Sequence, residues 1–87
     1  MKYAVETANR RVERQIERLP REVYPRVRDI LLALEETPRP IGAIKVKDDI
    51  YRVRVGDYRI IYHVDDYRRL VIVAKVARRK ENTYRGL

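Results

Sequence analysis

The stretch IYRVRVGDYRIIYHV, residues 50–64, constrains the fold of this chain more than any other. Two runs rich in Ile, Val and Tyr flank Gly56 and Asp57, and a Gly-X pair suits the two-residue type II′ turn of a β-hairpin. Counting outward from that turn places Arg54 opposite Arg59. Because side chains alternate between the faces of a strand, the hairpin is predicted to have an apolar face and a cationic face. The apolar set is Val53, Val55, Tyr58, Ile60 and Tyr62, and the other set is Arg52, Arg54, Arg59 and His63.

The cationic face has a small folding cost. Like charges directly opposite each other on a ladder destabilise it by a few tenths of a kcal/mol up to about 1 kcal/mol, and Arg54 and Arg59 are such a pair. A polyanion bound over the face would remove this repulsion. The alternative is that each arginine extends into solvent on its own.

Composition narrows the class of partner. The chain has 21 Lys and Arg against 13 Asp and Glu, a net charge of +8 and a pI near 10.1, which favours nucleic acid as a partner and an acidic protein as the second choice. Cysteine is absent, so disulfides and thiolate metal sites are excluded. No apolar run has the length of a membrane span and no signal-peptide pattern is present, so the expected location is the cytoplasm and no membrane partner is expected.

The remaining segments predict the other elements of one domain, residues 1–87. An edge strand is expected over residues 2–6, followed by a helix that Thr7 or Asn9 caps, and by a second helix from Pro20 to about Leu34. The run 37–42 ends that helix. Strands are expected at 43–47, with Lys45 and Lys47 on one side, and at 70–76, where LVIVAKV is typical of a central strand.

This order of elements defines the fold class. It predicts an α+β domain in which two N-terminal antiparallel helices pack on one face of a twisted, mainly antiparallel sheet of about four to five strands. The opposite face is left to the hairpin arginines and the basic C-terminal tail.

Few kinds of chemistry are available to such a chain. It has one His, no Cys and no Ser, so nucleophilic triads are excluded. Its glycines are isolated, and its paired aspartates fall in expected turns, so we expect neither a metal nor a small-molecule cofactor. RNA carries its own nucleophile, the 2′-OH. A cationic surface can orient that group and stabilise charge on phosphorus, and a lysine or tyrosine crowded by cations can accept a proton, which makes Lys45, Lys47 and Tyr84 candidates.

The segment YRVRVGDYRIIYHVDD (51–66), together with the hydrophobic strand after it and the tail RRKENTYR (78–85), resembles the RelE/ParE superfamily of toxins from toxin–antitoxin modules. In the RelE branch the resemblance implies a toxin that enters the ribosomal A site. There it cleaves mRNA without a metal and leaves a 2′,3′-cyclic phosphate and a 5′-hydroxyl. Carried over by position, the implied catalytic residues are Arg52, Arg54, Arg59 and Tyr84, with Arg79 if the preceding strand sets the register or Arg78 if Tyr84 does. The implied RNA-binding residues are Lys45, Lys47, Lys80 and Arg85.

One departure from that pattern concerns proton transfer. Well-known RelE members have lysines where this chain has Arg52 and Arg54, and guanidinium is a poor proton acceptor. General-base duty would then fall to Tyr84, Lys47 or solvent.

Two other functions are compatible with the same sequence. The ParE branch shares the fold and poisons DNA gyrase, and a non-catalytic module would only dock on rRNA or an antitoxin. Both toxin branches imply a cognate acidic antitoxin, and the RelE branch also implies the ribosome and mRNA as partners.

Overall fold

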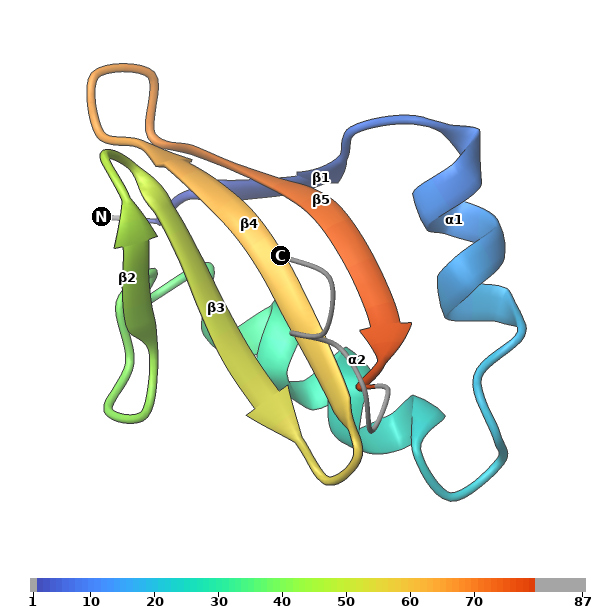
Figure 1. Cartoon of the computed structure of the whole chain (residues 1–87). Helices are drawn as coiled ribbons and strands as arrows, with labels where there is room; N and C mark the ends of the chain where they lie inside the picture. Colours follow the sequence, from blue (N-terminus) through green and yellow to red (C-terminus); the bar gives the residue numbers. More distant parts are fainter. Residues whose placement is uncertain (1, 80–87) are drawn as a thin grey trace, which may run out of the picture.

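A five-stranded sheet with two helices against one face makes up the fold (Figure 1). The computed structural model describes residues 2–79. In chain order its elements are β1 (Ala4–Thr7), α1 (Arg10–Glu17), α2 (Tyr24–Ala33), β2 (Ile44–Lys47), β3 (Ile50–Val55), β4 (Tyr58–Asp65) and β5 (Leu70–Arg78). The strand order is β1-β5-β4-β3-β2, and all pairs are antiparallel except β1 with β5. The predicted α+β class is confirmed.

The central hairpin has the predicted register. Val55 pairs with Tyr58, Arg54 with Arg59, and the ladder continues to Ile50 and His63. Gly56 has a φ of +59°, the left-handed value that a type II′ turn requires at its first central position and that glycine adopts without strain.

The core lies between the helices and one face of the sheet. Val12 of α1 and Val27 of α2 are 1% and 0% exposed, and they pack against strand residues that alternate inward. The strand residues of the core are Val53, Val55, Ile60, Tyr62, Val64, Val71, Val73 and Val76, with Leu34 completing it after α2. The face of the sheet opposite the helices is called the outer face below; it faces the reader in Figure 1.

The helix starts differ in how well they were predicted. Asn9 caps α1, because its side-chain oxygen accepts a hydrogen bond from Val12 N at 3.1 Å. The predicted start of the second helix at Pro20 is wrong, since α2 begins at Tyr24. Residues 21–23 form a turn in which the N–H groups of Val23 and Tyr24 both donate to Pro20 O. Pro25 has no N–H and is tolerated only in a first turn, so the helix has to begin close to it.

Strand β5 contains a bulge. Ile61 pairs with Lys75 and Tyr62 with Val73, so Ala74 is an extra residue without a partner on β4. A bulge changes the phase of the side chains that follow it. The buried positions accordingly run from Val71 and Val73 to Val76, a spacing that strict alternation does not give.

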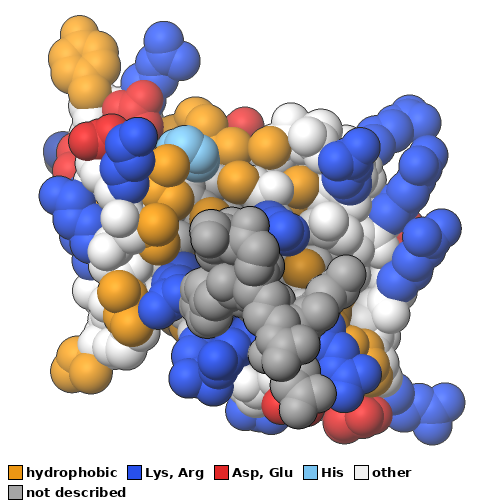
Figure 2. Space-filling model, viewed as in Figure 1, with side chains coloured by type: hydrophobic (Ala, Val, Ile, Leu, Met, Phe, Trp, Pro, Cys, Tyr) orange, Lys and Arg blue, Asp and Glu red, His pale blue; other side chains and the backbone are white. Residues whose placement is uncertain are grey.

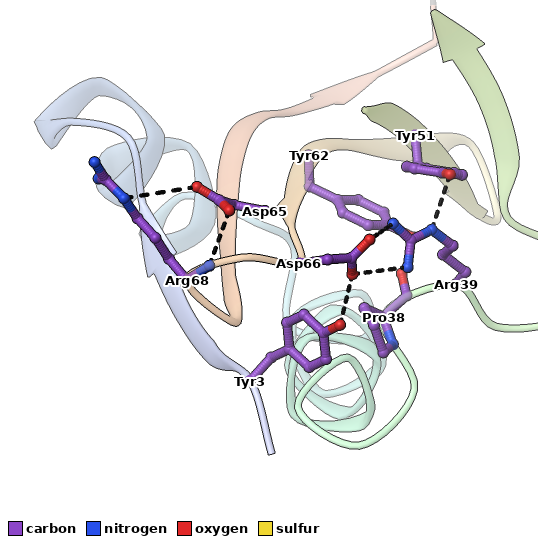
Figure 3. Close-up of polar contacts among 8 residues, drawn as sticks. All are labelled: Tyr3, Pro38, Arg39, Tyr51, Tyr62, Asp65, Asp66 and Arg68. Atoms are coloured by element: carbon purple, nitrogen blue, oxygen red, sulfur yellow. Dashed lines mark hydrogen bonds and ion pairs between the residues drawn. The ribbon is translucent and has the colours of Figure 1, made fainter. Parts of the chain in front are cut away.

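A polar cluster ties the chain end before β1 and the loop after α2 to the sheet (Figure 3). Arg39 Nη2 lies 2.7 Å from Asp66 Oδ2, Arg39 Nε donates to Tyr51 Oη at 2.8 Å, and Tyr3 Oη donates to Asp66 Oδ1 at 2.5 Å. Tyr62 Oη also donates to a main-chain oxygen of this loop. We call Tyr3, Arg39, Tyr51 and Asp66 the clasp.

Hydrogen bonds within the clasp change the acidity of its members. Those from Arg39 and Tyr3 lower the pKa of Asp66, and the bond to Asp66 raises the pKa of Tyr3. Burial raises the pKa of Tyr62 to about 12. The clasp therefore favours an ionised Asp66 beside neutral phenols.

Candidate nucleic-acid interface

Four arginines line one hollow on the outer face of the sheet. Arg52 and Arg54 come from β3, Arg59 from β4, and Arg79 directly follows β5. The hollow has a volume of about 250 Å³, including the part that opens to solvent, and we call it the arginine hollow. Figure 2 shows Lys and Arg side chains gathered on this side of the molecule around the hairpin end. The predicted cationic face is thus present, and its arginines converge.

The hairpin ladder positions three of these side chains. Arg54 and Arg59 are direct partners across β3 and β4, and Arg52 is two residues away on the same face. Val53 and Val55, which alternate with these arginines, are buried on the helix side. A slip of one residue would bury the arginines, so the same valines that form the core keep the guanidinium groups on the outer face.

Arg79 is held in place through its main chain. Its N–H donates to Asp57 O at 2.6 Å, which ties the end of β5 to the hairpin turn. Sequence reasoning gave Asp57 only a turn role, because no local pattern shows that a distant strand will end beside that turn.

The structure places the two arginines at the end of β5 on different sides of the sheet. Arg78 pairs with Tyr58, a residue on the same face as Val55, and it lines a separate groove that contains Val23 and Arg26. Arg79 is therefore the member of the hollow, as expected if the preceding strand sets the register. Arg78 does not line the hollow, because its side chain lies toward the helices, and its predicted catalytic role stays a prediction.

Three of the four arginines of the hollow have no charged partner in the described part of the chain. Within residues 2–79, the side chains of Arg54, Arg59 and Arg79 form no ion pair. Arg59 Nε is buried and donates no hydrogen bond to any of these residues, whereas buried polar groups are normally paired. Guanidinium groups crowded in this way suit phosphate, which accepts paired hydrogen bonds from arginine.

The lysines of β2 do not share a face as predicted. A register shift between them places Lys45 opposite Tyr51 and Lys47 opposite Ile50, and these partners belong to opposite faces of β3. Neither lysine lines the arginine hollow. Strict alternation failed here because β2 carries an irregularity that its sequence does not reveal.

His63 lies apart from the arginine hollow. His63 Nδ1 is 3.7 Å from Asp49 Oδ1, at the opposite end of β4 from Arg59. Lys80, Tyr84 and Arg85 fall outside the described residues, so their predicted roles stay predictions. Among residues 2–79 there is no group of three or more His, Asp or Glu side chains that could hold a metal ion, and no helix there is both long and apolar enough to cross a membrane.

Solved structures share this fold. The chain superimposes on the archaeal RelE of a RelE–RelB complex from Pyrococcus horikoshii OT3 with a TM-score of 0.79 and 28% identity, covering 93% of this chain and 99% of that one. The isolated RelE toxin of E. coli gives a TM-score of 0.79 at 22% identity and covers 91% and 86% of the two chains. The fold is that of the RelE toxins.

Sequence comparison agrees with the fold. Residues 5–83 match the model of the ParE toxin of type II toxin–antitoxin systems, parDE. The RelE1 protein of Methanocaldococcus jannaschii is 33% identical over 93 residues, covering 99% of each chain. This chain belongs to the RelE/ParE superfamily of toxins of toxin–antitoxin modules and is a RelE-like member.

Proposed function

We propose that this toxin is a ribosome-dependent mRNA endoribonuclease that cleaves by attack of the RNA's own 2′-OH. The observation that carries the proposal is the convergence of Arg52, Arg54, Arg59 and Arg79 around one hollow on the outer face. A sugar-phosphate chain is the natural ligand for such a site, since each phosphate can accept paired bonds from a guanidinium group.

The arginines supply electrostatic stabilisation rather than proton transfer. When the 2′-oxygen attacks phosphorus, its bond to phosphorus forms, the bond to the leaving 5′-oxygen breaks, and negative charge builds on the non-bridging oxygens. Preorganised donors aimed at that charge lower the barrier, and loss of one such donor elsewhere costs about 10²–10³ in rate. The 2′-OH proton goes to a base and the leaving oxygen gains a proton, which gives a 2′,3′-cyclic phosphate and a 5′-hydroxyl.

The base is not one of the hollow's arginines, because guanidinium stays protonated. The candidates are Tyr84, Lys47 and solvent. The position of Lys47 on β2, away from the hollow, weighs against it, which leaves Tyr84 and solvent as the preferred acceptors. Substitution of Tyr84 by Phe, which removes only the hydroxyl, separates these two.

The proposed protein partner is an acidic antitoxin. The P. horikoshii RelE was solved as a complex with RelB, and the net charge of +8 on this chain favours an acidic binding segment. We propose that the antitoxin covers the helices and either buries the arginine hollow or displaces the tail.

A second candidate function has its own support. The matching family model describes ParE toxins, so inhibition of DNA gyrase is the alternative. The arginine hollow favours the nuclease, because a protein that only docks on gyrase has no need for four arginines around one hollow.

A translation extract distinguishes these functions. The protein is added to an extract programmed with a defined mRNA, and 5′ ends are mapped by primer extension. Codon-phased cuts that require ribosomes support the nuclease. Intact mRNA together with trapped gyrase–DNA complexes would overturn the nuclease and support the ParE function. If neither effect is seen, the protein is a non-catalytic binding module.

A further inference from the structure

We propose that Gln15 on α1 is a positioning residue that fixes the register of β5 and thereby holds Arg79 in the arginine hollow. Gln15 Oε1 accepts a hydrogen bond from Val76 N at 2.9 Å, in a partly buried contact between residues 61 positions apart. The link from Gln15 to RNA cleavage rests on the proposed function. The link from Gln15 to the register does not.

The end of β5 needs a partner other than a strand. Its parallel neighbour β1 pairs only as far as Thr7 with Val73, and the Ala8 N–H donates to Val73 O as the chain leaves the sheet. Beyond that point α1 lies beside β5 (Figure 1). An unpaired main-chain N–H at a partly buried edge is costly, and the Gln15 side chain satisfies the one on Val76.

This contact lies directly after the bulge. The extra residue, Ala74, falls between the pairs Tyr62–Val73 and Ile61–Lys75, and Val76 is the first buried residue after it. Gln15 therefore holds β5 at the point where its side chains have just changed phase.

The bulge determines which face of the sheet each later side chain of β5 occupies, and so which arginine lines the hollow. In the bulged strand Ala77 pairs with Arg59 and Arg79 lines the hollow, while Arg78 lies on the helix side. Without the bulge in this place, alternation from Val73 would put Lys75 and Arg79 on the helix side and Arg78 on the outer face. Burial of the Val76 side chain also favours the observed arrangement of side chains on the two faces of β5. The hydrogen bond to Gln15 therefore acts together with hydrophobic burial.

Two substitutions separate the hydrogen bond from the side-chain volume. Gln15→Glu keeps an oxygen acceptor at similar length, and Gln15→Leu removes it. We expect Gln15→Leu to lower ribosome-dependent cleavage about tenfold or more, as small misplacements of catalytic groups do, and Gln15→Glu to stay close to the parent protein. Val12→Ala, which weakens the α1 contact with the core and leaves the Gln15 bond in place, is the control, with all assays run where each variant is folded.

Deletion of Ala74 provides the sharper test. The deletion removes the extra residue and keeps the pairs Tyr62–Val73, Ile61–Lys75 and Arg59–Ala77. Regular alternation then places Arg79 on the outer face without a bulge that Gln15 has to stabilise. In that background, cleavage should become insensitive to Gln15→Leu.

Nuclear magnetic resonance gives a readout that does not depend on RNA. In Gln15→Leu we expect faster exchange of the Val76 amide hydrogen and weaker cross-strand contacts between Arg59 and Ala77. If both are unchanged, or if Val12→Ala lowers cleavage as much at equal stability, the positioning role is overturned. If the parent protein cleaves no RNA, the nuclease proposal fails and the spectra still decide the role of Gln15.

Discussion

Arg78 and Arg79 are adjacent and identical, yet only Arg79 lines the hollow. Arg79→Ala and Arg78→Ala therefore each remove one positive charge from the chain, but only Arg79→Ala removes it from the hollow. We expect Arg79→Ala to lower the rate of mRNA cleavage by about 10²-fold, the scale for loss of one charge-stabilising donor, and Arg78→Ala to change it less than about threefold. Primer extension in a translation extract measures both, and equal losses would contradict the assignment.

Arg54 and Arg59 lie directly opposite each other, and Arg59 Nε is buried and has no acceptor in the part of the chain that the structure describes. Both features oppose folding when no phosphate is bound. Arg59→Thr, which retains a good strand former, should raise the free energy of unfolding by a few tenths of a kcal/mol up to about 1 kcal/mol while it lowers RNA cleavage.

Urea unfolding at low and high salt measures this gain in stability. Because salt screens the repulsion in the parent protein, the difference between the two proteins should shrink at high salt. A destabilised Arg59→Thr protein would show that the pair does not oppose folding.

At the scale of elements, the parts of the fold that sequence could predict depend on local chemistry. The Gly56–Asp57 turn fixed the register of β3 and β4, and Asn9 marked the start of α1, because a positive φ and a free helix N-terminus each demand particular residue types. Three of the four arginines of the hollow followed from that register alone.

The features that sequence reasoning missed depend on contacts between distant segments. The irregularity in β2 separates Lys45 from Lys47, and the bulge in β5 sends Arg79 rather than Arg78 to the hollow. The bulge is supported by Gln15, which belongs to a helix far away in the chain. No residue in LVIVAKV signals this partner, so the choice between the two arginines could not be made from the strand itself.

The clasp is expected to make the stability of the folded protein depend on pH. Hydrogen bonds from Arg39 and Tyr3 lower the pKa of Asp66 below its ordinary value of 3.8. A group with a lowered pKa in the folded state adds stability that is present above the ordinary value and is lost as the pH falls through the lowered one. The melting temperature of the parent protein should therefore fall more steeply below about pH 4 than that of Asp66→Asn.

The control for this prediction is Asp48→Asn, which makes the same chemical change outside the clasp. Asp48 has a φ of +47°, and asparagine tolerates that conformation. Melting curves from neutral to acidic pH measure the effect in all three proteins. Parallel curves for the parent protein and Asp66→Asn would show that Asp66 does not couple folding to pH.

On the scale of the whole molecule, the residues that form the core and the arginines of the hollow lie on opposite faces of the sheet. Both helices and the buried valines lie on one side of the sheet, and the arginine hollow lies on the other. Substitutions in the hollow are therefore expected to leave the core intact, which makes the arginine variants interpretable as tests of the proposed function.

Binding of RNA by the hollow should follow the salt dependence of counterion release. For single strands, log Kobs falls with log salt by about 0.7 for each phosphate contact, so the four arginines of the hollow predict a slope of about −2 to −3. The ligand is a short RNA with a 2′-deoxy sugar at the scissile position, which cannot be cleaved. Arg79→Ala should make the slope shallower by about 0.7, while Arg10→Ala, on the exposed surface of α1, should leave it unchanged. A slope near zero, or equal changes in both variants, would show that RNA does not bind through the outer face.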